Sequence, residues 1–128
     1  MYYIDEKSFA DYQINWESIV STIEESTNIL SEGDFSQPVK PYLRYRDLNN
    51  RIIAMPAFIG GSQDISGIKW IASFPKNIKK NIPRAHSVLV LNESHTGVPV
   101  CIFNTPKLSI IRTSSVSGLI VQKYVSSF

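Results

Sequence analysis

ISGIKWIASF, residues 65–74, is the stretch of sequence that decides the fold. One set of alternate positions holds Ile65, Gly67, Lys69 and Ile71, and the other holds Ser66, Ile68, Trp70 and Ala72. Side chains that alternate with a period of two and include β-branched and aromatic residues are typical of a β-strand. We therefore predict a strand here, with Lys69 as a charged residue inside an otherwise apolar segment.

Similar runs on either side predict a sheet. We expect further strands over residues 39–46, 51–58, 86–92 and 99–103. The polar segment 47–50 separates the first two runs, and the turn 94–97 (Ser-His-Thr-Gly) predicts a hairpin between the last two. A basic loop, residues 76–84, lies between the third and fourth strands.

Two long helices are predicted around this sheet. Apolar residues recur at helical spacing over residues 16–32, with Asn15 as a capping residue and Gly33 as a stop. Thr105 and Pro106 are typical of a helix start and predict a second helix over 106–124. A short helix is expected near residues 5–11.

The predicted fold class is α+β. We expect a largely antiparallel sheet of about five or six strands, a long N-terminal helix and a C-terminal helix, forming one domain over residues 1–128. The length of 128 residues, with 43% hydrophobic and 19% charged residues, suits one folded core and leaves no room for a full-size dinucleotide-binding (Rossmann) domain.

Composition also narrows the cellular compartment that we expect for the protein. No run of 18 apolar residues is present, and the N-terminus lacks the pattern of a signal peptide. A single cysteine, Cys101, excludes an internal disulfide. We expect a cytoplasmic protein with no membrane partner.

Charge is distributed unevenly along the chain. Residues 1–37 hold eight acids and one base, a net charge of −7, whereas residues 38–128 hold three acids and twelve bases, a net charge of +9. The basic segment could attract an anionic ligand, or it could lie beside the acidic helix in the same molecule. No motif supports a nucleic-acid partner, and we expect none.

Most familiar catalytic patterns are missing from the sequence. It holds no G-x-G-x-x-G, no P-loop, no H-E-x-x-H and no cluster of metal ligands. His86 and His95 have no partner at ligand spacing. Cys101 lies in an apolar run, where a free thiol behaves as a small hydrophobic group.

Three cations lie inside apolar segments: Arg44, Lys69 and Arg112. A cation in such a place needs an anionic partner or a path to solvent along its aliphatic stem. If the three converged, they would form a site for a carboxylate ligand, because Arg can bind both carboxylate oxygens at once.

Four short motifs resemble one known family. The order and spacing of these motifs are similar to those of the ornithine cyclodeaminase/μ-crystallin family: Arg51-Ile-Ile-Ala-Met-Pro56, Gly67-Ile-Lys-Trp70, Asn92-Glu-Ser-His-Thr-Gly-Val-Pro99 and Ile111-Arg-Thr-Ser-Ser-Val-Ser117. Within the family, Val39-Lys-Pro-Tyr-Leu-Arg44 and Ile65-Ser-Gly-Ile-Lys-Trp-Ile-Ala-Ser73 most resemble the branch that makes 2,3-diaminopropionate for siderophore and antibiotic precursors. That branch contains NAD-dependent N-(2-amino-2-carboxyethyl)-L-glutamate dehydrogenases.

The resemblance implies an amino-acid oxidoreductase with two domains. One domain binds substrate and forms a homodimer through its sheet, and the other is a Rossmann domain for NAD. It implies that Arg44, Lys69 and Arg112 bind the substrate carboxylate, and that Thr113 and Ser114 contact NAD. Arg84 is a further candidate, since an extra cation would suit a dicarboxylate substrate.

The sequence departs from the family in one important respect. It ends at Phe128, before the family's G-x-G-x-x-G turn, so we expect a truncated chain that lacks the Rossmann domain, binds NAD weakly, contains no catalytic residue of its own and is inactive alone. The alternative is a non-catalytic dimeric module that binds a small ligand, or a remnant of the enzyme.

Overall fold

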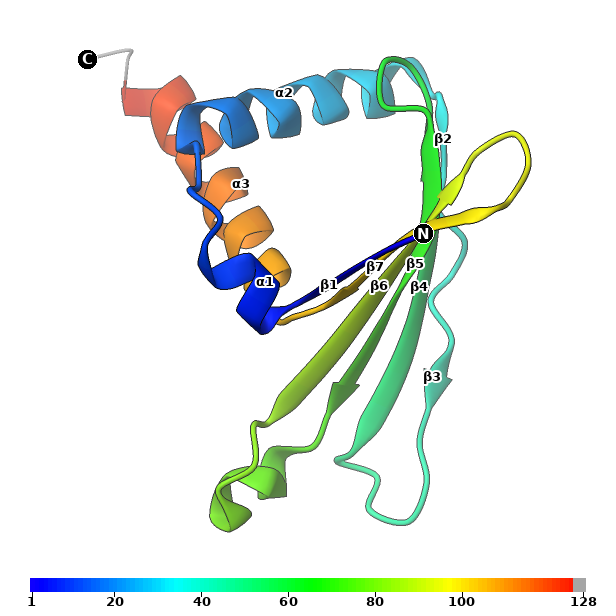
Figure 1. Ribbon diagram of the computed structural model, residues 1–128, viewed down its shortest axis with the longest axis vertical. Coiled ribbons are helices and arrows are strands. Elements are labelled where there is room, and N and C mark those ends of the chain that lie inside the picture. The colour runs from blue at the N-terminus through cyan, green and yellow to red at the C-terminus, as the bar shows by residue number, and fades with distance from the viewer. Residues whose placement is uncertain (126–128) are drawn as a thin grey trace.

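The structure is a computed structural model that describes residues 1–125. Its α-helices lie on one side of a single sheet (Figure 1). The elements, in chain order, are β1 (Tyr2–Asp5), α1 (Glu6–Ala10), α2 (Trp16–Glu32), β2 (Phe35–Ser36), β3 (Tyr42–Leu43), β4 (Arg51–Ile59), β5 (Ile65–Ser73), the 3₁₀ helix η1 (Pro75–Lys80), β6 (Ala85–Glu93), β7 (Pro99–Asn104) and α3 (Lys107–Val125). The fold class is α+β, as the sequence predicts.

The sheet has seven strands, in the order β1-β7-β6-β5-β4-β2, and β3 also pairs with β4. Strands β4 to β7 form antiparallel pairs with their neighbours, and β2 and β3 both run antiparallel to β4. Only β1 is parallel to its neighbour, with Tyr2 opposite Cys101 and Asp5 opposite Asn104. The prediction of five or six strands missed β1, whose partner lies almost the whole chain away.

The segment 39–46 is not the long strand that the sequence predicts. Only Tyr42 and Leu43 pair with β4. Pro38 and Pro41 have no amide hydrogen to donate to a sheet, so the chain between β2 and β3 crosses the edge of β4 without regular pairing. The prediction was wrong because β-branched and aromatic composition was given more weight than the two prolines.

The register of β4, β5 and β6 separates the two faces of the sheet. One row across it holds Met55, Lys69, Leu89 and Phe103, and the next row holds Pro56, Ile68, Val90 and Ile102. The first row faces the helices, because Phe103 shares a cavity with residues of α2 and α3. The second row therefore lies on the face that no helix covers, so Lys69 points toward the helices and Ile68 away from them.

Local signals set the limits of α2. The side chain of Asn15 accepts a hydrogen bond from the backbone N–H of Ser18, and Gly33 adopts a left-handed conformation with φ of 86°. The helix is then tied to the β4–β5 turn, because the Asp34 carboxylate accepts a hydrogen bond of 2.8 Å from Gly61 N–H. This attachment holds α2 across one end of the sheet (Figure 1).

Helix α3 begins at Lys107, whose N–H donates to the hydroxyl of Thr105 at 3.2 Å. Its small residues allow close packing on α2. Ser115 is fully buried, and a Cβ at Gly118 would lie 3.4 Å from Cγ2 of Val20. No helix within residues 1–125 is both long enough and apolar enough to cross a bilayer.

The acidic N-terminal segment and the basic segment meet partly within one molecule. Glu6 pairs with Lys107, and Glu24 pairs with Lys123, so α3 binds acids of both α1 and α2. These two pairs account for only part of the positive charge after residue 37. The cations near the centre of the sheet take part in neither of these two ion pairs.

Candidate functional site

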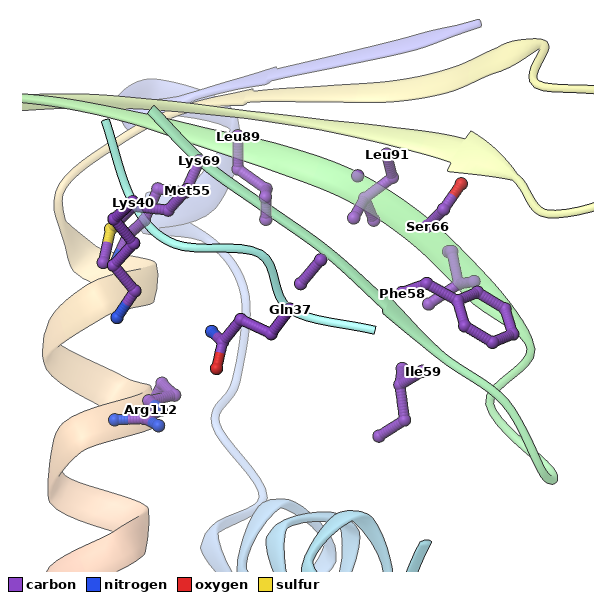
Figure 2. A pocket seen from close by; sticks show the side chains of 13 residues that line it. Gln37, Lys40, Met55, Phe58, Ile59, Ser66, Lys69, Leu89, Leu91 and Arg112 are labelled. Atoms are coloured by element: carbon purple, nitrogen blue, oxygen red, sulfur yellow. The ribbon is translucent and has the colours of Figure 1, made fainter. Parts of the chain in front are cut away.

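A cavity of about 380 Å³ lies between the helix-covered face of the sheet, α3 and the segment after β2. Its floor is formed by alternate residues of β4, β5 and β6, and its charged lining residues are Lys40, Lys69 and Arg112 (Figure 2). Among the described residues that line it, none is acidic. We call this the cationic cavity.

Lys69 lies at the centre of the sheet and enters the cationic cavity from β5. Burial lowers its pKa below the ordinary value of 10.5, and the positive charges of Arg112 and Lys40 lower it further. Within residues 1–125, no carboxylate forms an ion pair with any of these three side chains. The cavity therefore concentrates positive charge without a protein anion to balance it.

Gly67 lines the cavity close to Lys69 and allows β5 to approach β6 closely. A Cβ at this position would lie 2.4 Å from the carbonyl oxygen of Val90 and 3.1 Å from Cδ2 of Leu91, so only glycine permits this approach of β5 to β6. The Gly-Ile-Lys motif thus combines close strand packing with a cation on the floor of the cavity.

Arg112 enters from α3. Its side chain lines the cationic cavity, a second cavity of about 240 Å³ shared with Lys69 and Thr113, and an apolar cavity of about 470 Å³ between α1, α2 and α3. The structure thus brings together Lys69 and Arg112, two of the three cations that the sequence singles out.

The third cation, Arg44, is placed elsewhere. Its Nη1 donates to the carbonyl oxygen of Leu48 at 2.6 Å, and its guanidinium carbon lies 5.7 Å from the centre of the Tyr42 ring. Arg44 is exposed and is not among the described residues that line the cationic cavity. Its distance from the site follows from the irregular course of the chain after Pro41.

Lys40 is a cavity residue that the sequence interpretation missed. It lies in the irregular segment between β2 and β3, together with Gln37, and both line the cavity. Figure 2 shows the amide of Gln37 pointing into the same space that Arg112 faces. A lysine between two prolines, as in Pro-Val-Lys-Pro, was the available sign that this residue sits outside the regular sheet.

The remaining candidate residues differ in whether they line a cavity. Arg84 is exposed beside η1, where its carbonyl accepts a hydrogen bond from Phe74, and it does not line the cationic cavity. Thr113 lines the second cavity, and its hydroxyl donates to the carbonyl of Ser109 at 2.8 Å. Ser114 is exposed on α3.

The histidines and the cysteine do not contribute to the site. His95 pairs with Asp64 at 3.1 Å in the β6–β7 turn, His86 is exposed, and Cys101 is buried. No group of three or more His, Cys, Asp or Glu residues within positions 1–125 could hold a metal ion. The cations that line the cavity are suited to binding and orienting an anion.

Comparison with known proteins identifies the family. The model of the ornithine cyclodeaminase/mu-crystallin family matches residues 4–127. The N-((2S)-2-amino-2-carboxyethyl)-L-glutamate dehydrogenase of Staphylococcus aureus (strain NCTC 8325 / PS 47) is 43% identical over 103 residues, which are 77% of this chain and 31% of the relative. This confirms the family predicted from the motifs and the resemblance to the diaminopropionate branch.

Solved structures confirm the fold. The Delta(1)-pyrroline-2-carboxylate reductase of Thermococcus litoralis, in complex with NADH and L-proline, matches with a TM-score of 0.84 and 21% identity over 94% of this chain and 37% of that one. An archaeal alanine dehydrogenase dimer with bound NAD matches with a TM-score of 0.81 and 23% identity, over 94% and 36% of the two chains.

The chain spans about a third of the length of these proteins. The family match nevertheless covers nearly the whole sequence, and the cavity is lined by residues from three of the motifs that define the resemblance. The chain therefore belongs to the ornithine cyclodeaminase/mu-crystallin family.

Proposed function

We propose that this chain is the substrate-binding and dimerisation part of an NAD-dependent amino-acid oxidoreductase, and that Lys69 and Arg112 bind the carboxylate of an amino acid. The observation that carries the proposal is the cationic cavity, in which two motif cations meet without an acidic lining residue among those described. A carboxylate supplies the negative charge that the protein does not, and a guanidinium can bind both of its oxygens.

Electrostatics favours ligand binding over an empty cavity. In the free protein the positive charge of Arg112 lowers the pKa of Lys69, which means that the two cations repel each other. A bound carboxylate would offset part of the positive potential of Arg112 and Lys40 and raise the pKa of Lys69. The two cations that repel each other in the free protein would therefore both attract an anionic ligand.

NAD would meet this chain on the Thr113 side of the Lys69–Arg112 pair. Thr113 uses its hydroxyl hydrogen on Ser109, so its oxygen lone pairs remain able to accept hydrogen bonds, for example from a carboxamide. The exposed hydroxyl of Ser114 lies next to it. When bound, NAD would supply the hydride acceptor for oxidation of the substrate. The sequence has no Gly-rich phosphate-binding turn, so we expect these residues alone to hold NAD weakly.

The face of the sheet that no helix covers is the proposed dimer surface. Alternate residues of four strands present apolar side chains there, including Pro56, Ile68, Trp70, Val90 and Ile102. Trp70 is 45% exposed in the single chain. An apolar face of this extent is expected to be covered in solution. The structurally similar archaeal alanine dehydrogenase is a dimer.

A second function is a small-ligand-binding module without catalysis. It requires only the binding of an anion by Lys69 and Arg112, which the cationic cavity offers without any further group. Coupling between ligands separates the two functions. At NAD⁺ concentrations high enough to overcome the weak binding expected of this chain alone, tighter amino-acid binding supports the oxidoreductase, and amino-acid binding that NAD⁺ does not change supports the module.

Calorimetric titration tests the carboxylate site directly. We expect the chain to bind L-alanine more tightly than L-alaninamide, which lacks the carboxylate. Lys69→Met and Arg112→Met should each weaken alanine binding by about tenfold or more, because each removes a charged hydrogen-bonding partner. Lys80→Met, which removes an exposed cation at the end of η1, is the matched control. Equal binding of the two ligands, or binding of neither, would contradict the proposal.

A further inference from the structure

We infer that one end of the sheet binds the surface of an anionic lipid bilayer through exposed cations and aliphatic side chains. This surface, which we call the basic tip, consists of residues 43–51, around the turn between β3 and β4, and residues 75–84, which hold η1. It lies at the opposite end of the sheet from α2 (Figure 1). None of its residues lines the cationic cavity, so the inference is independent of the proposed function.

The two segments of the basic tip form a single surface. Lys76 of η1 makes an ion pair of 2.7 Å with Asp47 of the other segment. In the sheet, the first residue of β4, Arg51, lies opposite the last residue of β5, Ser73. The turn after β3 and the loop after β5 are therefore held side by side where these two strands meet.

Positive charge is concentrated at the basic tip. Its two segments carry seven cations and one acid, a net charge of +6, whereas the rest of the chain carries six cations and ten acids, a net charge of −4. All seven cations are exposed: Arg44, Arg46, Arg51, Lys76, Lys79, Lys80 and Arg84. Among residues 1–125, only Lys76 of these seven forms an ion pair. The charge of the other six is therefore free to attract an anionic partner.

Aliphatic side chains stand among these cations. Leu48 is 68% exposed, Ile78 is 64% exposed, and Leu43 and Ile82 are exposed as well. Single apolar side chains are common on protein surfaces, but four of them within a cluster of cations make a surface that is both apolar and basic. Aliphatic side chains can enter the acyl boundary of a bilayer while neighbouring lysines and arginines extend to the phosphate groups.

The basic tip suits a bilayer better than a nucleic acid or a folded protein. None of the three cavities described above is lined by its residues, so none of them offers a pocket there for a base or for a partner's side chain. Of its five large apolar residues that are exposed, only Tyr45 is aromatic, whereas single-stranded nucleic acids are bound mainly by stacking on aromatic rings.

A fluid bilayer needs no pocket, and it supplies both negative charge and an apolar interior. Binding at its surface also needs no spanning segment, so the lack of such a segment in the sequence does not exclude this partner. The basic tip would thus attach the chain to the membrane surface, with the aliphatic side chains inserted and the cations at the level of the headgroups.

Sedimentation with lipid vesicles tests the inference. The chain should bind vesicles of phosphatidylglycerol mixed with phosphatidylcholine and should not bind phosphatidylcholine vesicles, and binding should weaken as the salt concentration rises. Lys79→Gln should weaken binding about fivefold, the contribution of one lysine near an anionic membrane surface. Lys7→Gln is the matched control, because Lys7 is an exposed lysine of α1 outside the basic tip, and it should bind as the wild type does.

A second pair of variants tests the apolar part of the surface. Ile78→Gln should weaken vesicle binding by about fivefold, because it removes an aliphatic group from the acyl boundary. Ile120→Gln, which changes an exposed isoleucine of α3, is its control and should have no effect. Far-ultraviolet circular dichroism of each variant checks that the fold is retained.

Two results would overturn the inference. One is equal binding to the two kinds of vesicle, or binding to neither. The other is vesicle binding that Lys79→Gln weakens and Ile78→Gln does not, together with displacement of the chain from the vesicles by an RNA oligonucleotide. That second result would assign the basic tip to a nucleic acid, because charge alone would then account for its binding.

Discussion

Lys69 on β5 and Arg112 on α3 line one cavity, and their positive charges face each other without an intervening protein carboxylate among residues 1–125. Burial is the larger cause of the lowered pKa of Lys69, and Arg112 is the next. Functional sites commonly hold such unfavourable arrangements, because the ligand resolves them. Under the proposed function, a bound carboxylate would relieve the repulsion within this pair.

The first prediction is that Lys69→Met stabilises the free protein at neutral pH. The variant removes a half-buried charge and its repulsion from Arg112, and we expect a gain on the order of 0.5 kcal/mol, in the lower range of single stabilising substitutions. Thermal unfolding at pH 7 without ligand measures it. An unchanged or lowered Tm would show that the aliphatic stem of Lys69 contributes more than its charge costs.

The pH dependence of that gain has a definite sign. The pKa of Lys69 is lower in the folded chain than the ordinary 10.5, so folding is disfavoured while the lysine is protonated. As the pH rises from the folded pKa toward 10.5, the unfolded chain holds the extra proton and the wild type gains stability. The advantage of Lys69→Met over the wild type should therefore shrink as the pH rises toward 10.5. A constant difference would exclude a charge effect.

The second prediction concerns the contact between β5 and β6. Gly67→Ala should destabilise the chain by about 1–3 kcal/mol, because the new Cβ would lie 2.4 Å from the carbonyl oxygen of Val90. Gly118→Ala is the control, since its Cβ would make only an ordinary contact of 3.4 Å with Val20. Alanine also favours a helix, so this variant should be neutral or slightly more stable. Urea unfolding of both variants measures the two changes in the free energy of unfolding.

The third prediction concerns the pKa of the Asp47 carboxyl group. Lys76, at 2.7 Å, and then Asn49 lower the pKa of Asp47 from 3.8 to about 2. Carboxyl-carbon NMR should find this low value in the wild type and a rise toward 3.8 in Lys76→Met. Asn49→Ala should produce a smaller rise, because the backbone N–H of residue 49 still donates to the carboxylate.

The pair of Asp47 and Lys76 also makes the stability of the protein depend on pH in the acid range. A carboxylate with a lowered pKa contributes stability above its unfolded pKa and loses it as the pH falls through the folded one. The contribution of Asp47 should therefore be present above pH 3.8 and disappear between 3.8 and about 2. Asp47→Asn should be less stable than the wild type at pH 6 and should approach it at pH 2. A difference independent of pH would mean that the carboxylate charge is not involved.

The fourth prediction tests the proposed dimer surface. Trp70→Glu places a charge on the face of the sheet that no helix covers, and should raise the dimer dissociation constant at least tenfold by sedimentation. Ile120→Glu is the matched control, because Ile120 is 52% exposed on α3, on the other side of the sheet. Loss of the dimer in the control alone, or a monomeric wild type, would contradict the proposed surface.

Much of the fold follows from local sequence. Asn15 and Gly33 mark the two ends of α2 because capping hydrogen bonds and a left-handed turn depend on the residues at those positions. Alternation in residues 65–73 placed Lys69 and Ile68 on opposite faces before any partner strand was known. The helices and the central hairpins were therefore predictable.

The candidate site was predictable only in part. Motif and charge singled out Lys69 and Arg112, which the fold brings together, but also Arg44 and Arg84, which it does not bring to the cavity. Lys40 went unnoticed because its importance depends on where the irregular segment crosses β4. The sequence shows that the segment contains two prolines and does not show which side chain they direct inward.

By itself, then, the sequence determined the family, the α+β class, the limits of α2 and the face of β5 on which Lys69 lies, since each depends on neighbouring residues or on motifs. The tertiary structure alone decided that β1 pairs with β7 and that Lys40 joins Lys69 and Arg112. Both are contacts between distant segments, and such contacts depend on how whole elements pack and leave little trace in local sequence.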